Sequence, residues 1–343
     1  MATHERDGAP CDDRAVLPTQ LDAEGVADLA AAHPGWFTTA GYAVPPGRPQ
    51  VRLLGRGESC AVWEVEPGLA VRVPHRPVHE LPLGLDAELD LLTRVPADAD
   101  LAARPVAVRL PTEGDPTAYL VSTAVPGEVR APADWTDELL AALARALARL
   151  HVGGRTEGLP APAAPDPVAA AHAARDWWRE HEPGPAAVLD PLWPAVLRRS
   201  EQSLPAFGSV ETALVHGDAC LSNVVVDGGV PRLVDWEWAH VGDPARDLAF
   251  SGGPVHADPW YAPMDERRVR AQAQAYARER ERLGAPVDLG PLLVRREVWL
   301  LHETFFIQPH LHRVAAAATD PARRTTYLEA ATQLRDGLER WLG

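Results

Sequence analysis

LVHGDACLSNVVVDGGVPRLVDWEWAHVGDPARDLAF, residues 214–250, is the stretch on which the fold of this chain depends. It holds three short apolar runs, at 214–215, 224–226 and 233–234, each bounded by Gly, Asp or Asn. Such runs are typical of short buried strands joined by tight loops. The turn at 227–229, Asp-Gly-Gly, predicts a hairpin, because glycine adopts the positive φ that tight turns require.

Four polar residues lie at the predicted strand ends and loop tips around this hairpin: His216, Asp218, Asn223 and Asp235. The arrangement gathers two carboxylates and one amide at one edge of a small sheet. Oxygen ligands of this kind suit a hard divalent cation, and Mg²⁺ that carries a nucleotide phosphate is the natural candidate. The alternative for any one of these residues is the capping of a turn, which is a common role of Asp and Asn in loops.

The order and spacing of these residues resemble the catalytic segment of the aminoglycoside phosphotransferases, small-molecule kinases with a protein-kinase-like fold. Protein kinases carry H-R-D-x-x-x-x-N followed by D-F-G. Here Asn223 follows Asp218 by the same five residues, with Gly217 in place of the arginine and Asp-Trp-Glu at 235–237 in place of D-F-G. The continuation at 242–249, GDPARDLA, also resembles that of the family.

The resemblance covers most of residues 50–250 and implies an α+β, bilobal fold. The N-lobe would be an antiparallel sheet with a helix, and the C-lobe would be mostly helical. A length of 343 residues is in keeping with two lobes. We expect a flexible tail at 1–20, a nucleotide-binding N-lobe at 21–123 and a catalytic, acceptor-binding C-lobe at 124–343.

The resemblance also implies roles for the residues of the segment. Asp218 would orient the acceptor hydroxyl and receive its proton, and Asn223 and Asp235 would hold Mg²⁺ with ATP or GTP as the phosphoryl donor. His216 and Asp247 would hold the catalytic loop by hydrogen bonds without taking part in the chemistry.

Upstream, residues 51–74 are predicted to form three strands with a glycine-rich turn, Gly55-Arg56-Gly57-Glu58-Ser59-Cys60, after the first. Such a turn either lets backbone N–H groups approach phosphates or is a plain hairpin. Arg72 stands where the family usually has a phosphate-binding lysine; it either does that work or is a surface residue of an edge strand. The family also pairs this position with a helix carboxylate, for which Glu88 is the candidate and Asp86 and Glu80 are alternatives. The resulting nucleotide-binding prediction is Gly55, Gly57, Ser59, Arg72, Glu88 and, at the hinge strand, Ser122 and Ala124.

The acceptor end is the part that motifs constrain least. Helices are predicted at about 136–151, 168–182, 190–203, 263–283, 289–307 and 320–342. Five residues are candidates for binding the acceptor: Glu237, Asp243, Trp299, His302 and Glu303. The two acids at 237 and 243 are equally well explained as solvated loop residues. We expect His302, His310 and His312 to have packing or solvent roles, since nothing in the sequence makes them converge on a metal.

A net charge of −15 argues against a nucleic-acid partner, which requires basic residues. The charge suits a cationic substrate, and it is equally well explained by solubility alone. The chain has no apolar run long enough to cross a bilayer, and its first residues are polar, unlike a signal peptide. Cys11, Cys60 and Cys220 lack metal spacing and predict free thiols, which suit a reducing compartment, so we expect the protein in the cytoplasm. We expect a monomer or a homodimer.

Three functions remain open at this point. The first is a phosphotransferase that acts on an antibiotic, in resistance or self-protection. The second is a metabolic or biosynthetic kinase for a sugar, an amino alcohol or a nucleoside. The third is a catalytically silent nucleotide-binding module; the presence of Asp218, Asn223 and Asp235 counts against it, and the arginine at position 72 favours it.

Overall fold

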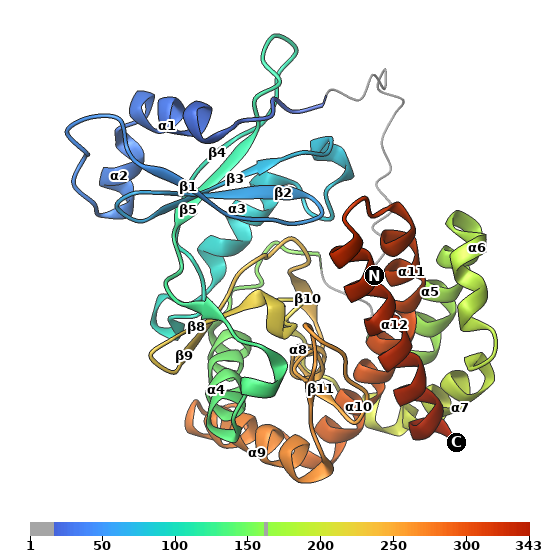
Figure 1. Cartoon of the computed structure of the whole chain (residues 1–343). Helices are drawn as coiled ribbons and strands as arrows, with labels where there is room; N and C mark the ends of the chain where they lie inside the picture. The colour runs from blue at the N-terminus through green and yellow to red at the C-terminus, as the bar shows by residue number, and fades with distance from the viewer. Residues whose placement is uncertain (1–16, 161–163) are drawn as a thin grey trace. The chain divides into compact units, whose positions relative to one another are not determined.

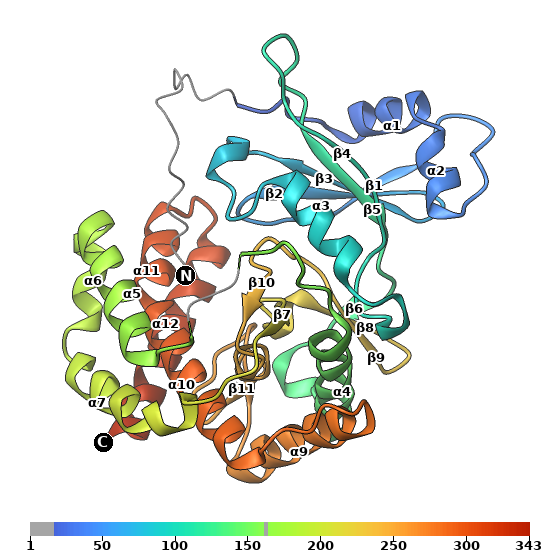
Figure 2. The same ribbon diagram turned by 180° about the vertical axis from the view of Figure 1, so that it is seen from behind.

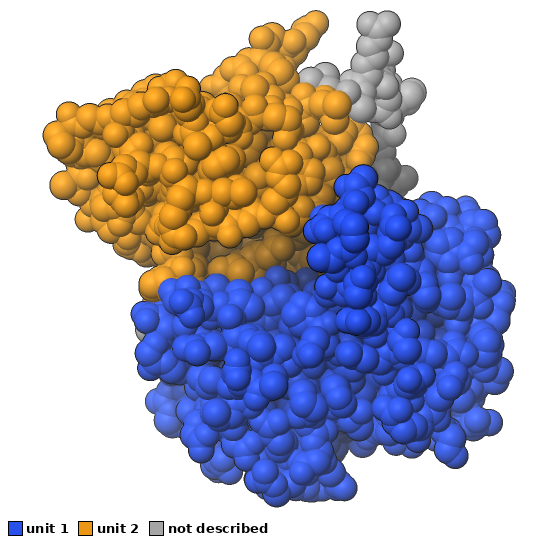
Figure 3. All heavy atoms as spheres, viewed as in Figure 1, with its two compact units in different colours: residues 1–3, 127–232, 240–343 blue, residues 4–126, 233–239 orange. Residues whose placement is uncertain are grey.

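A computed structural model describes residues 17–160 and 164–343. The chain forms two compact units, coloured separately in Figure 3. One unit holds the described residues up to Pro126 together with Leu233–Ala239, and the other holds 127–232 and 240–343. Most of the tail predicted at 1–20 lies outside the described residues.

The first unit is built on a five-stranded antiparallel sheet in the order β1-β2-β3-β5-β4 (Figure 1). Its strands are β1 (Val51–Arg56), β2 (Cys60–Val65), β3 (Leu69–Pro74), β4 (Pro105–Arg109) and β5 (Tyr119–Thr123). The helices of this unit are α1 (Ala23–Ala32), α2 (Gly35–Ala40) and α3 (Leu85–Arg94).

Side-chain alternation along β3 places the apolar core on one face of the sheet and Arg72 on the other. Val71 and Val73 belong to a buried apolar core that includes Trp36 and Phe37 of α2. Successive side chains of a strand point to opposite faces, so Arg72 projects from the other face. That face carries α3, whose Glu88 bonds to Arg72.

The second unit is mostly helical. Its helices are α4 (Asp137–Gly153), α5 (Pro167–His181), α6 (Pro183–Ala186), α7 (Trp193–Ser203), α8 (Ala245–Ala249), α9 (Glu266–Arg282), α10 (Leu289–Phe306), α11 (Gln308–Ala317) and α12 (Pro321–Leu342). Leucines and alanines of α4 recur at helical spacing and are buried, and α4 and α9 lie side by side (Figures 1 and 2). The N-cap of α4 is Thr136, whose side chain accepts a hydrogen bond from the Leu139 N–H.

Three small sheets complete this unit. β6 (Glu128–Val129), β8 (Val224–Asp227) and β9 (Val230–Leu233) form one, β7 (Ala213–Val215) pairs with β10 (His240–Gly242), and β11 (Gly252–Gly253) pairs with β12 (Ala262–Pro263). The predicted hairpin is present between β8 and β9: Gly228 and Gly229 have φ of 55° and 85°. β9 begins at Val230, three residues earlier than the apolar run suggested.

α1 ends at Ala32, with His33 as its C-cap, and the separate helix α2 begins at Gly35 with Pro34 as its N-cap. α11, which contains His310 and His312, was not predicted from the sequence. Within residues 17–160 and 164–343, no helix has both the length and the hydropathy of a membrane span.

Candidate functional site

The turn that follows β7 depends on glycine. Gly217 has φ of 81°, a left-handed conformation that a residue with a Cβ adopts only at a cost. This bend separates His216 from Asp218. A short 3₁₀ helix, Leu221–Asn223, then leads directly into β8.

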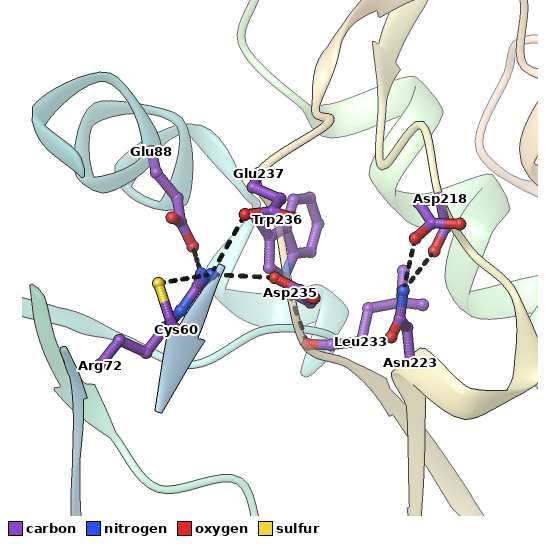
Figure 4. Close-up of polar contacts among 9 residues, drawn as sticks. All are labelled: Cys60, Arg72, Glu88, Asp218, Asn223, Leu233, Asp235, Trp236 and Glu237. Atoms are coloured by element: carbon purple, nitrogen blue, oxygen red, sulfur yellow. Dashed lines mark hydrogen bonds and ion pairs between the residues drawn. The ribbon is translucent and has the colours of Figure 1, made fainter. Parts of the chain in front are cut away.

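Asp218 and Asn223 are bonded to each other in this turn (Figure 4). The Asn223 amide nitrogen donates to the Asp218 carboxylate at 2.8 Å and to the Asp218 backbone carbonyl at 3.0 Å. With the nitrogen used in this way, the amide oxygen of Asn223 remains to accept a cation. The Asp218 carboxylate is held in one orientation by the same bond.

Asp247 holds the turn at 216–218 by hydrogen bonds. Its two carboxylate oxygens accept the backbone N–H groups of His216 and Gly217 at 2.8 and 2.9 Å. His151, at the end of α4, lies 3.1 Å from the same carboxylate through Nε2 and 2.9 Å from the Tyr276 hydroxyl through Nδ1. A carboxylate only accepts, so His151 donates from Nε2, and in that tautomer Nδ1 accepts from Tyr276.

The electrostatics of Asp247 agree with this anchoring role. Burial raises the pKa of a carboxyl group, but the hydrogen bonds from the His151 ring and the His216 N–H outweigh it and lower the pKa of Asp247. Asp247 is therefore ionised at neutral pH although its side chain is fully buried.

In the other unit, Arg72 is surrounded by three carboxylates (Figure 4). It bonds to Glu88, lies 3.0 Å from Asp235 Oδ1 through Nη2, and lies 3.7 Å from Glu237. Burial lowers the pKa of Arg72, but the three carboxylates raise it by more than burial lowers it, so the guanidinium stays charged. Of the three candidate acids, Glu88 is the one that pairs with Arg72, and it is buried at 2% exposure. The alternatives Asp86 and Glu80 are exposed and form no ion pair with Arg72.

An arginine at this position follows the composition of the whole chain. All 33 of its Lys and Arg residues are arginine, and lysine is absent. Arg72 is therefore no sign by itself of a lost function. The Cys60 thiol also lies 3.8 Å from Arg72 Nη2, and burial raises its pKa to about 11, so it remains neutral.

Asp235 has an unusual backbone. Its φ is 67°, in the left-handed region, where a non-glycine residue costs roughly 1–2 kcal/mol. The neighbouring Trp236 is buried and donates its indole N–H to the Leu233 carbonyl, while the Leu233 N–H donates to the Leu101 carbonyl. These bonds hold the strained residue in place, and strain of this kind is common at functional sites.

Each unit presents an oxygen donor of a kind that Mg²⁺ binds. These donors are the Asn223 amide oxygen in one unit and the Asp235 carboxylate, whose side chain is 43% exposed, in the other. Mg²⁺ is commonly held by one or two protein oxygens together with substrate phosphates, so a larger protein cage is not required. Within the described residues, no group of three or more His, Cys, Asp or Glu side chains could hold a metal ion without a substrate.

The predicted nucleotide-binding residues lie on or beside the sheet. Gly55 is in β1, Gly57 and Ser59 are in the turn before β2, and Ser122 is buried in β5. The Ala124 N–H donates to the Gly68 carbonyl at 2.8 Å, so only its carbonyl remains for a ligand.

Two residues proposed for the acceptor are engaged inside the protein. Asp243 is 4% exposed, and its oxygens accept from the Ala245 N–H, Arg295 and Trp299. His302 is 7% exposed, its Nε2 lies 2.8 Å from the Ser200 hydroxyl, and burial lowers its pKa to about 3. Both carboxylate oxygens of Asp243 and the Nε2 atom of His302 are therefore engaged in hydrogen bonds within the fold.

The other acceptor candidates differ in their surroundings. Glu237 lies 3.7 Å from Arg72 in the sheet-containing unit, and its side chain is 13% exposed, so it is not a solvated loop acid. Trp299 donates its indole N–H to Asp243. Glu303, on α10, accepts the Tyr261 hydroxyl at 2.9 Å and remains a candidate. The sequence had given no role to Tyr261, and no spacing relates it to Glu303.

Comparison with known proteins identifies the family. Residues 50–285 match the sequence profile of the phosphotransferase enzyme family, APH. Viomycin phosphotransferase of Streptomyces vinaceus is 36% identical over 151 residues, which cover 40% of this chain and 50% of that enzyme. The chain thus matches only about half the length of this curated relative.

Solved structures share the fold. The GDP complex of aminoglycoside 2'-phosphotransferase-IIIa has a TM-score of 0.57 at 16% identity, covering 84% of this chain and 92% of that one. Choline kinase from Cryptosporidium parvum has a TM-score of 0.59 at 15% identity, covering 94% and 99%. The predicted α+β, kinase-like fold with a sheet-containing N-lobe and a mostly helical C-lobe is confirmed, and the chain belongs to the phosphotransferase enzyme family.

Proposed function

We propose that this protein transfers the γ-phosphoryl group of ATP or GTP to a hydroxyl group of a small molecule, and that this molecule is an antibiotic. The observation that carries the proposal is the Asp218–Asn223 pair, bonded at 2.8 Å and anchored through Asp247. A turn with this construction holds one carboxylate in a fixed orientation, as positioning of an acceptor hydroxyl requires.

The residues divide the work as follows. Asp218 orients the acceptor hydroxyl and receives its proton late in the transfer, since a carboxylate is a weak base toward an alcohol. Asn223 and Asp235 would hold Mg²⁺ through their oxygen atoms, and the ion would neutralise the negative charge of the nucleotide phosphates. Arg72, held by the buried Glu88, presents a permanent positive charge for the phosphates of the nucleotide.

The antibiotic assignment rests on the relative that acts on viomycin and on the net charge of −15, which attracts a cationic acceptor. A second candidate is a metabolic kinase for an amino alcohol, favoured by the fold shared with choline kinase. We retain the cytoplasm as the proposed location, since Cys60 and Cys220 are free thiols, and nucleic acid is not a proposed partner.

The test is nucleotide turnover with Mg²⁺ and either ATP or GTP against viomycin, an aminoglycoside, a macrolide, choline and free sugars. We expect nucleoside diphosphate to form only when an accepted antibiotic is present, and that antibiotic to gain the mass of one phosphoryl group. Turnover with choline or a sugar alone would move the assignment to the second candidate. Mg²⁺-nucleotide binding without turnover on any acceptor would favour a silent module.

Arg72→Met is expected to lower kcat/KM for the nucleotide by roughly 10²-fold, because a charged donor to the phosphates is lost. It also leaves Glu88 buried without its cation, which should lower the free energy of unfolding by about 3 kcal/mol. Arg72→Lys retains a cation and should stay within about tenfold of the unaltered protein, since ammonium and guanidinium differ in geometry but not in charge. Steady-state kinetics and urea unfolding measure the two effects.

The control for this pair is Arg52→Met, which removes an exposed arginine of β1 that pairs with Glu64. An exposed ion pair contributes little, so neither measurement should change. Equal activity of the methionine and lysine variants at position 72 would contradict a phosphate-binding role for Arg72.

A further inference from the structure

His75 lies immediately after β3 and contacts the glycine-rich turn at two points. Its backbone N–H donates to the Ser59 carbonyl at 3.0 Å, which extends the β2–β3 ladder by one pair beyond Cys60 and Pro74. Its ring Nε2 lies 2.8 Å from the Glu58 carbonyl. One residue therefore fixes two successive carbonyl groups of the turn.

The ring is used on one side only. A carbonyl accepts and does not donate, so Nε2 carries the proton of this bond. The other nitrogen, Nδ1, is buried and has no hydrogen-bond partner among the described residues. The bond to Glu58 is thus the polar contact that orients the imidazole.

The bond to Glu58 determines the direction of the next N–H. The Glu58 carbonyl and the Ser59 N–H belong to one planar trans peptide, so they point in opposite directions. Holding the carbonyl against His75 turns the Ser59 N–H away from it. In the described part of the chain no hydrogen bond engages this N–H, although Ser59 is only 5% exposed.

A buried backbone donor without a partner is uncommon in folded proteins. Backbone N–H groups of glycine-rich turns bind anions, because they bring positive partial charge without a side chain in the way. The Ser59 N–H has the properties of such a donor: its direction is fixed, and no hydrogen bond within residues 17–160 and 164–343 uses it.

We propose that His75 is a positioning residue for the nucleotide, which fixes the Gly55–Cys60 turn so that the Ser59 N–H meets a phosphate oxygen. The inference rests on the proposed function in one respect, that this turn lies over nucleotide phosphates. His75 would therefore affect the binding of the nucleotide phosphates, and it would not affect the binding of the nucleobase or of the acceptor.

The experiment compares binding of a nucleoside diphosphate with binding of its nucleoside, ADP with adenosine or GDP with guanosine, by calorimetry in Mg²⁺. His75→Ala is expected to weaken diphosphate binding by roughly 3- to 10-fold, the effect of one neutral hydrogen bond. Nucleoside binding should not change. His75→Gln, whose amide N–H can take the place of Nε2–H, should restore most of the diphosphate affinity.

His79→Ala is the matched control, an exposed histidine of the same segment, and should bind both ligands normally. Thermal melting of each variant checks that the sheet is intact. Three results would overturn the proposal. Equal losses of nucleoside and diphosphate affinity would mean that His75 only stabilises the sheet. The other two are unchanged diphosphate affinity in the alanine variant and no diphosphate binding to the unaltered protein. The readout requires no acceptor, so failure to phosphorylate any acceptor contradicts the proposed function and leaves this result standing.

Discussion

Replacing Asp218 by asparagine is expected to lower kcat for phosphoryl transfer by roughly 10²–10⁴-fold, the contribution of a positioned proton acceptor. Asparagine is the informative substitution because its side-chain oxygen can still accept from the Asn223 amide, which the carboxylate does at 2.8 Å. The turn should therefore keep its shape while losing the charge. Mg²⁺-nucleotide affinity should be unchanged, because Asp218 has no assigned role in holding the nucleotide.

Steady-state kinetics on an accepted antibiotic and calorimetry with the nucleotide measure the two quantities. Asp227→Asn is the matched control: it removes an exposed carboxylate nine residues along the chain, at the end of β8. It should leave both quantities unaltered. If the variant at 218 keeps a kcat near that of the unaltered protein, Asp218 is not the residue that orients the hydroxyl.

Asp247→Asn is expected to reduce both stability and turnover, for a reason that is geometric. The two carboxylate oxygens accept separate N–H groups, from His216 and Gly217, and one oxygen also accepts from His151. An asparagine of the same size turns an NH₂ group toward one of these donors, inside a site with no exposure. The free energy of unfolding should fall by about 3–5 kcal/mol, the cost of breaking a buried pair, and kcat by roughly 10²-fold, since the turn that carries Asp218 shifts.

The dependence on pH separates this effect from general damage. The pKa of Asp247 lies below its ordinary value of 3.8, so its stabilising contribution is complete above that pH. It is lost as the pH falls through the lower folded-state pKa. The difference in unfolding free energy between the unaltered protein and the asparagine variant should therefore be constant from neutral pH to about 4 and shrink in more acidic solution.

Urea unfolding at a series of pH values gives this difference directly. Asp190→Asn is the control for an exposed carboxylate: the Asp190 side chain is 50% exposed and pairs with Arg175 and Arg179, so the difference in unfolding free energy should be small at every pH. A difference that stays the same down to the most acidic pH would show that the Asp247 carboxylate is not charged in the folded protein.

The sequence determined the parts of this protein that depend on local order and spacing. Asp218 and Asn223 are five residues apart on one turn, so a single bend at Gly217 and a short 3₁₀ helix bring them together. The β8–β9 hairpin follows from Gly228-Gly229, and the long helices follow from their apolar period. Glu88 could be selected only as one of three helix or loop acids, because spacing does not show which carboxylate is buried.

Only the tertiary structure decided the contacts that join distant segments. His151 contacts Asp247, 96 residues further along the chain, and Tyr276, 125 residues further along. A carboxylate and an imidazole are common in ligand sites, but Asp243 and His302 are both buried by packing around α10. Asp243 bonds to Arg295, and His302 bonds to Ser200. The His75 ring reaches Glu58 because β2 and β3 pair in one register. Local sequence sets turns and helices through backbone propensity, whereas the burial and partners of a side chain depend on which elements pack against it, and that is a property of the whole fold.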